Sequence, residues 1–146
     1  MKKLIFLLIA LVTVTITKAQ KVLEIEVPAG VKSILQRNYP DAGNLKWEKE
    51  AENYEAEFEV DETDYSVLID ASGNILETEV EIKIDALPAN AKNYVAKNYP
   101  GKKIKEAAKI TDTKGIVTYE AEVNDLDLIF DNSGKFLKTV KDQDNE

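Results

Sequence analysis

The chain of 146 residues contains no histidine and no cysteine. These absences exclude Ser–His–Asp triads, Cys–His dyads, histidine-bearing zinc sites and the attachment of c-type haem. They also exclude disulfides, so the fold must rely on packing alone. The six glycines stand apart from one another, and no glycine-rich phosphate loop is present. Among the side chains that usually carry chemistry, only carboxylates remain in quantity.

The carboxylates do not form a recognisable catalytic or metal-binding motif. A glycosidase-like pair needs two acids that face each other across a cleft and have separated pKa values. Glu55, Glu57 and Glu59 instead recur with a period of two, which is typical of a solvated strand face. That face, or residues 61–64, offers oxygens that suit calcium, but neither has the spacing of a calcium loop. We therefore expect no catalytic residue, no metal site and no cofactor.

The N-terminal segment has the pattern of a signal peptide. Lys2 and Lys3 precede an apolar run at residues 4–14, and Thr17-Lys18-Ala19 offers a cleavage site after Ala19. The run is short for a membrane span, although a retained N-terminal anchor is the alternative. Because no cysteine follows it, we do not expect a lipoprotein. The predicted signal peptide, residues 1–19, implies a periplasmic or secreted protein.

The charge of the chain limits its partners. Removing residues 1–19 takes away three lysines and no acid, which changes the net charge from −8 to −11. Nucleic acids and anionic membranes would repel such a surface. We expect no nucleic-acid partner and no membrane insertion after the signal is removed, while an unknown protein or peptide partner and a homo-oligomer both stay open.

A segment that occurs twice organises the rest of the chain. Residues 27–40 and residues 87–100 each read as a short helix between two prolines, and together they hold all four prolines. Proline suits the first turn of a helix, and it pushes the residue before it out of the helical region. Apolar residues recur on one helical face at matching positions. They are Val31, Ile34, Leu35 and Tyr39 in the first copy, and Ala91, Tyr94, Val95 and Tyr99 in the second.

The hydrophobic pattern after each helix alternates, which predicts about four antiparallel strands per copy. The aromatic side chains Trp47, Tyr54, Phe58 and Tyr65 should project to one face and pack in the core. Residues 70–74 and 131–134 are turns by composition.

We predict an α+β fold of two tandem repeats, each with one helix followed by four strands. The first repeat spans residues 20–83, the second spans residues 84–140, and residues 141–146 form a disordered tail. Both helices are expected to pack on one face of a shared or adjoining antiparallel sheet, because this buries the most apolar surface.

Several short motifs resemble the exported PepSY-like, beta-lactamase-inhibitor-like proteins of Bacteroidetes. The first repeat carries Trp47, Tyr54-Glu55-Ala56-Glu57-Phe58, Asp70-Ala71-Ser72-Gly73 and Glu77-Thr78-Glu79, and the second carries Leu87-Pro88, Asn98-Tyr99-Pro100, Tyr119-Glu120-Ala121-Glu122 and Asp131-Asn132-Ser133-Gly134. The inhibitor that gives the family its name grips an enzyme with a concave sheet built from two similar units. Related PepSY domains occur in protease propeptides. The resemblance thus implies binding or inhibition.

Four apolar residues are candidates for a protein-binding surface. By alternation, Leu68 and Ile75 in the first repeat, and Ile129 and Phe136 in the second, point away from the helices. Apolar side chains exposed on a sheet face often mark an interface. A dimer partner, the leading segment or sheet curvature could equally cover them.

Three classes of function compete. The first is an exported, non-enzymatic binding module, with inhibition of an envelope or secreted enzyme as one form of that binding. A self-associating structural protein that adds strands at a sheet edge is the second. An enzyme that uses carboxylates alone is the third.

Overall fold

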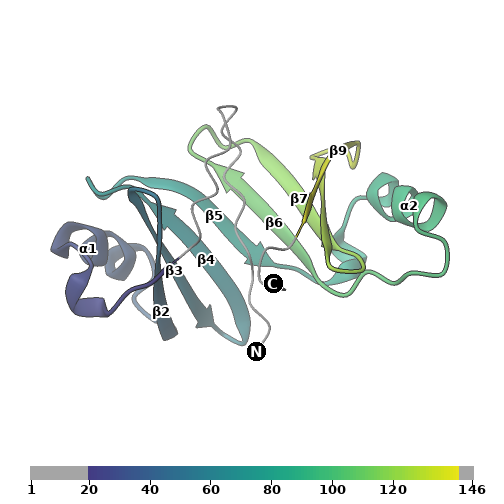
Figure 1. Ribbon diagram of the computed structural model, residues 1–146. Helices are drawn as coiled ribbons and strands as arrows, with labels where there is room; N and C mark the ends of the chain where they lie inside the picture. Colours follow the sequence, from purple (N-terminus) through teal and green to yellow (C-terminus); the bar gives the residue numbers. More distant parts are fainter. Residues whose placement is uncertain (1–19, 142–146) are drawn as a thin grey trace. The chain divides into compact units, whose positions relative to one another are not determined.

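The structure is a computed structural model that describes residues 20–141 (Figure 1). The predicted signal peptide and residues 142–146 of the predicted tail lie outside this range. The first elements are β1 (Gln20–Lys21), the 3-10 helix η1 (Glu24–Glu26), α1 (Ala29–Asn38), β2 (Gly43–Glu50), β3 (Asn53–Val60), β4 (Thr63–Ile69) and β5 (Ile75–Glu81). The others are the 3-10 helix η2 (Ile84–Ala86), α2 (Ala89–Asn98), β6 (Ala107–Asp112), β7 (Val117–Glu122), β8 (Leu126–Asp131) and β9 (Phe136–Lys141).

The chain divides into two compact units, residues 1–78 and residues 79–146. Neighbouring strands in the sheet follow one another in the sequence. Strand β5 crosses the boundary between the units, and the strand pairs within each unit are antiparallel. The predicted α+β class, the antiparallel strands and the two repeats are confirmed. The repeat boundary at residue 83, and a common face for both helices, stay predictions.

Helix α1 begins and ends where the prolines allow it. Pro28 is its N-cap, with φ −54°, and Tyr39 leaves the helical region as the C-cap, immediately before Pro40. The buried residues Val31 and Leu35 lie one turn apart on the face that meets the strands. In the second unit, Pro88 and Tyr99 occupy the same two capping positions around α2.

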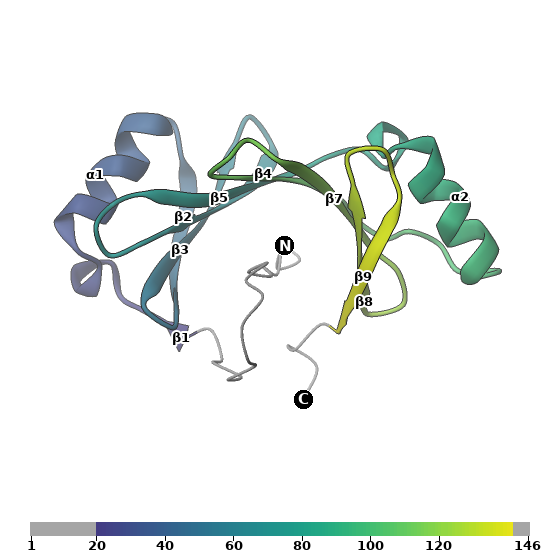
Figure 2. The ribbon, with the colours of Figure 1, turned by 90° about the horizontal axis from the view of Figure 1, so that it is seen from above.

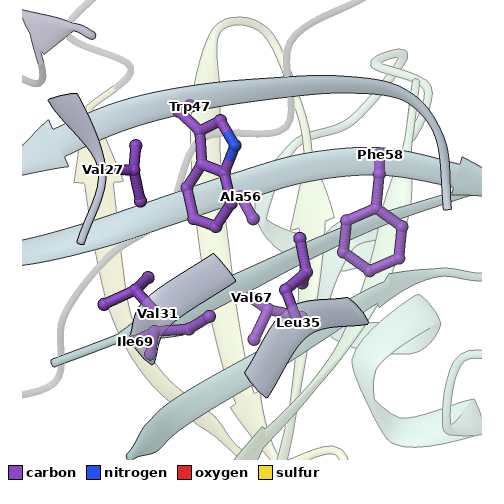
Figure 3. Packing of buried hydrophobic residues seen from close by; sticks show 8 residues of the cluster. All are labelled: Val27, Val31, Leu35, Trp47, Ala56, Phe58, Val67 and Ile69. Carbon is purple, nitrogen blue, oxygen red and sulfur yellow. The ribbon is translucent and has the colours of Figure 1, made fainter. Parts of the chain in front are cut away.

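One face of the strands in the first unit packs against α1 (Figures 2 and 3). The buried core of this unit consists of Val27, Val31, Leu35, Trp47, Ala56, Phe58, Val67 and Ile69. The partly buried Tyr54 and Tyr65 pack against it, and Phe58 stacks on Tyr65 with ring centroids 5.5 Å apart. The predicted aromatic core is therefore confirmed. Full burial of each of the larger aliphatic side chains contributes about 1.5–3 kcal/mol.

The second unit fills the corresponding core with different side chains. Ala107 pairs with Ala121 as Trp47 pairs with Ala56 in the first unit, so an alanine replaces the indole. Aromatic side chains supply the volume instead. Phe136 stacks on Tyr94 with ring centroids 4.4 Å apart, and both rings contact Phe130. The two units thus build equivalent cores from different residues.

The turns after β4 and β8 hold the strand ends in the same way. Asp70 Oδ1 accepts hydrogen bonds from the backbone N–H groups of Ser72 and Asn74, each at 2.9 Å. Asp131 Oδ1 accepts the equivalent bonds from Ser133 and Lys135. These side-chain hydrogen bonds to the local backbone stabilise tight turns. The turns predicted at residues 70–74 and 131–134 are confirmed.

Candidate functional site

Two of the four predicted surface residues lie on the face opposite the helix of their unit. Leu68 sits between Val67 and Ile69, which both pack in the core with α1, so alternation directs Leu68 to the other side. Ile129 has the same relation to Leu128 and Phe130. However, Leu68 is 0% and Ile129 is 1% exposed. The expectation that they form an exposed apolar patch is wrong.

The other two residues lie on the helix side, so their predicted orientation is wrong. Phe136 stacks on Tyr94 of α2, and Ile75 packs against the core of the first unit. A β-bulge explains the error in the second unit. Ile129 pairs with Lys138 while Phe130 pairs with Phe136, which leaves Leu137 as an extra residue. The extra residue inverts the alternation, and period-two reasoning cannot anticipate this.

The face of the first unit that carries no helix in the described part of the chain is lined with carboxylates instead. Glu55 pairs with Glu48 of β2 on one side and with Leu68 of β4 on the other. Glu57 pairs with Lys46 and Ser66. We call this surface the helix-free face of the first unit, defined by Glu48, Glu50, Glu55, Glu57, Ser66 and Leu68.

Glu55 lies at the centre of this face and is only 3% exposed. The Ser66 hydroxyl donates a hydrogen bond of 2.6 Å to Glu55 Oε1. The pKa of Glu55 is raised to about 9, mainly by burial, with the charges of Glu50, Glu57 and Glu48 acting in the same direction and the Ser66 hydrogen bond acting against them. The expectation of a solvated face is therefore wrong for Glu55, whose side chain is almost fully removed from water.

Glu50 is an acidic neighbour of Glu55 on the same face. Burial and the nearby Glu48 raise the pKa of Glu50, whereas a side-chain hydrogen bond with Glu55 lowers it. The two residues lie on adjacent strands and share a face, since Glu48 pairs with Glu55 and Glu50 is two residues beyond Glu48. Sequence periodicity showed the row of acids on β3. It did not show that an acid from β2 reaches the same point, because that depends on strand register.

The second unit places different chemistry at the matching positions. Glu120 pairs with Ala108 and Ile129, just as Glu55 pairs with Glu48 and Leu68. By the same register, Ile110 stands where the first unit has Glu50. The opposite face of the second unit therefore combines the buried carboxylates Glu120 and Asp127 with buried apolar residues. Strand β6 therefore does not repeat the acids Glu48 and Glu50 of strand β2.

Other features of the second unit are more exposed. Lys105 forms ion pairs with Glu122 at 3.0 Å and with Asp125 at 2.7 Å, and these two hydrogen bonds raise its pKa. Next to Lys105 is an open groove of about 520 Å³. Its walls are Glu81, Ile82, Lys83, Ile84, Asp85, Lys105, Glu106 and Ala107, which mix both signs of charge. These lining residues do not bring together several side chains of one charge or one chemical type.

The described residues offer little for catalysis or for a bound ion. Within residues 20–141, no group of three or more Asp or Glu side chains could hold a metal ion. The same residues include no helix that is long and apolar enough to cross a membrane. The helix-free face of the first unit brings together the buried Glu55 and Ser66 and the partly exposed Glu50.

Comparisons place these features in a known fold. The sequence matches the model of the family described as "Putative beta-lactamase-inhibitor-like, PepSY-like" over residues 13–77 and 62–138. A DUF2874 family protein from Bacteroides uniformis is 20% identical, with a TM-score of 0.70 over 82% of this chain and 92% of that one. A BLIP-like protein from Bacteroides fragilis is 22% identical, with a TM-score of 0.63 over 82% of this chain and 89% of that one.

A third similar structure, from Bacteroides eggerthii, is described as that of "putative periplasmic proteins". It is 17% identical, with a TM-score of 0.71 over 79% of this chain and 88% of that one. No curated protein matches the sequence. At these identities the solved structures establish a shared fold and not a shared activity.

Proposed function

This chain belongs to the beta-lactamase-inhibitor-like, PepSY-like family, and on that basis we propose that it is an exported, non-enzymatic protein-binding module. The resemblance inferred from sequence motifs is thus confirmed, and the binding role is the proposal. The module acts in the periplasm or outside the cell, in keeping with the predicted signal peptide and with the description of a similar structure as periplasmic.

The observation that carries the proposal is the difference between the two faces of the first unit. One face is filled by α1 and the hydrophobic core. The other presents the partly exposed carboxylates Glu48, Glu50 and Glu57 around the buried Glu55. Such a face suits a protein surface that brings lysine or arginine side chains, because complementary charge favours both association and orientation.

The same geometry argues against a carboxylate-only enzyme at this position. A glycosidase needs its two carboxyl groups at least about 5 Å apart, so that a sugar or water fits between them. Glu55, the central acid of this face, is only 3% exposed, which leaves little room for a sugar or an attacking water at its carboxyl group. We therefore favour binding over catalysis for this face.

Site-specific photo-cross-linking in the native cell envelope tests the proposal. A photoreactive amino acid at Glu57, on the helix-free face of the first unit, should give an adduct with one defined protein. The same amino acid at Gln36, which is exposed on α1, should not. Adducts of equal strength from both positions would contradict binding through the helix-free face. An adduct between two copies of this chain would favour the self-associating structural protein instead.

Charge reversal then tests the proposed chemistry. For this test the photoreactive amino acid replaces Lys46, which pairs with Glu57 on the same face. The double substitution Glu48→Lys and Glu57→Lys should then abolish the adduct with the partner protein. Asp41→Lys combined with Glu62→Lys makes the same change in net charge at exposed positions outside this face, and should leave the adduct intact. Circular dichroism of both double variants confirms that they are folded. Loss of the adduct in both would show that only overall charge matters.

A further inference from the structure

We propose that two copies of this chain associate through the free edge of β9, so that the acidic residues after β9 in one copy lie along the lysines of β9 in the other. The partner at this edge is a second copy of the chain. The proposal concerns the second unit and does not depend on the helix-free face of the first unit.

Strand β9 offers an edge at which a further strand can pair. It is last in the strand order, and within the described part of the chain it pairs with β8. Beyond the bulge at Leu137, residues 138–141 run in regular register with residues 129–126 of β8. The N–H and C=O groups along the outer side of such a strand are a template for the addition of another strand.

The other edge of the sheet is less suited to pairing. In the described part of the chain, β1 has two residues, and the register of β2 beside it is irregular between Gly43 and Lys46. Short strands and bulges are common devices that prevent pairing at an edge. Because β9 supplies the regular edge of each chain, two chains related by a two-fold axis form a closed dimer rather than a filament.

The charges at β9 select the partner. Residues 135–141 hold three lysines and no acid, whereas residues 142–146 hold three acids and no lysine or arginine. An antiparallel pair of these segments lays the basic half of one copy against the acidic half of the other. Lysine on an edge strand disfavours pairing with most strands, but opposite charges on facing residues stabilise a pair. A second copy of this chain supplies those opposite charges.

One register matches the charges twice. When Val140 faces Val140 of the second copy, Lys138 of each copy faces Asp142 of the other. Lys138 pairs with Ile129 on β8, so β8 places an apolar residue opposite it rather than an acid. A shift of one residue would bring Lys138 against Lys141 and is unfavourable.

Contacts with α2 limit the pairing to the second half of β9. Phe136 stacks on Tyr94 of α2 with ring centroids 4.4 Å apart. The Asn90 side-chain amide donates a hydrogen bond of 2.9 Å to the Ser133 carbonyl in the turn before β9. These contacts hold the first end of β9 next to α2, which leaves residues 138–142 for the second strand. An interface of this size predicts a weak, concentration-dependent dimer.

Sedimentation equilibrium of the mature protein, residues 20–146, tests the proposal. The wild type should show a monomer–dimer equilibrium whose dissociation constant rises with salt. Lys138→Glu and Asp142→Lys should each raise this constant by about tenfold or more, because each places like charges opposite one another at two symmetric positions. Lys109→Glu, at an exposed position on β6, makes the same change in net charge as Lys138→Glu and should leave the constant unchanged.

Charge exchange separates direct pairing from a general effect of charge. The double variant with Lys138→Glu and Asp142→Lys should dimerise as the wild type does. An equimolar mixture of the two single variants should form a dimer of one copy of each, because every facing pair then has opposite charges. Failure of either combination to restore the dimer would overturn the proposal. So would a wild type that stays monomeric up to about 1 mM.

A cysteine at the two-fold axis tests the register. The chain has no cysteine, so Val140→Cys introduces a single thiol. The Cα atoms of facing residues in an antiparallel pair are about 4.5–5.5 Å apart, which a disulfide can span. Mild oxidation should link two copies of Val140→Cys, and should link Leu137→Cys, at the bulge of the same strand, much less. Equal linking of both variants would contradict the register, whatever photo-cross-linking from the first unit finds.

Discussion

Ser66 donates a 2.6 Å hydrogen bond to Glu55 across neighbouring strands, and both side chains are buried on the face of the first unit that faces away from α1. A serine and a glutamate are ordinary on a solvated strand. Here the contact places a carboxyl group among other carboxylates and away from water. The consequences for stability can be measured directly.

Replacement of Glu55 by Gln should remove most of the pH dependence of stability above pH 5. In the wild type, folding takes up a proton between pH 4.5 and about 9, so the free energy of unfolding should fall by at most about 1.4 kcal/mol per pH unit in this window. Urea unfolding near pH 5 and near pH 8 measures this slope. Glu55→Gln should be nearly flat and more stable than the wild type near pH 8. Glu59→Gln should keep the wild-type slope, and a flat wild-type profile would contradict the prediction.

Replacing the adjacent residues Phe136 and Leu137 one at a time tests whether the β-bulge is present. Phe136→Ser should destabilise the protein by about 3 kcal/mol, because it removes a ring that stacks on Tyr94 in the core. Leu137→Ser should cost less than about 1 kcal/mol, since Leu137 is 49% exposed. Thermal unfolding of both variants makes the comparison. The reverse order of stability would mean that alternation continues through β9 without a bulge.

The glycines of the two equivalent turns should differ in their tolerance of alanine. A Cβ at Gly134 would lie 2.8 Å from the backbone nitrogen of Ala91, and the residue has φ +82°. Gly134→Ala should therefore cost about 3 kcal/mol or more, from strain and overpacking together. Gly73 has a similar φ of +87°, but its nearest contact would be 3.4 Å. Gly73→Ala should cost only about 1–2 kcal/mol in the same urea unfolding assay.

The turn between β3 and β4 should gain stability from a glycine. Asp61 and Glu62 both have positive φ, at 50° and 62°, which a side chain disfavours and glycine does not. Glu62→Gly should raise the free energy of unfolding by about 1 kcal/mol. Glu52 lies in the preceding turn, where Ala51 and not Glu52 has a positive φ. Glu52→Gly should therefore give no gain, and an equal gain in both variants would show that backbone strain is not the cause.

The parts of the fold that depend on local rules were predictable. Proline at both ends placed the helices, period-two alternation placed the strands, and Asp-x-Ser-Gly placed the two turns that Asp70 and Asp131 hold. The orientation of Phe136 was not predictable. A single extra residue, Leu137, inverts alternation, and its effect is set by pairing with β8 rather than by the sequence of β9.

The sequence by itself determined the family, the tandem repeat, the α+β class and the excess of acid. Each of these follows from composition or from short-range periodicity along the chain. Only the tertiary structure decided which acids matter. Strand register brings Ser66 of β4 to Glu55 of β3, and burial at that point raises the pKa of a carboxyl group that the strand pattern alone would place in solvent. Register and burial depend on contacts between distant residues, and for that reason the row of glutamates on β3 did not reveal them.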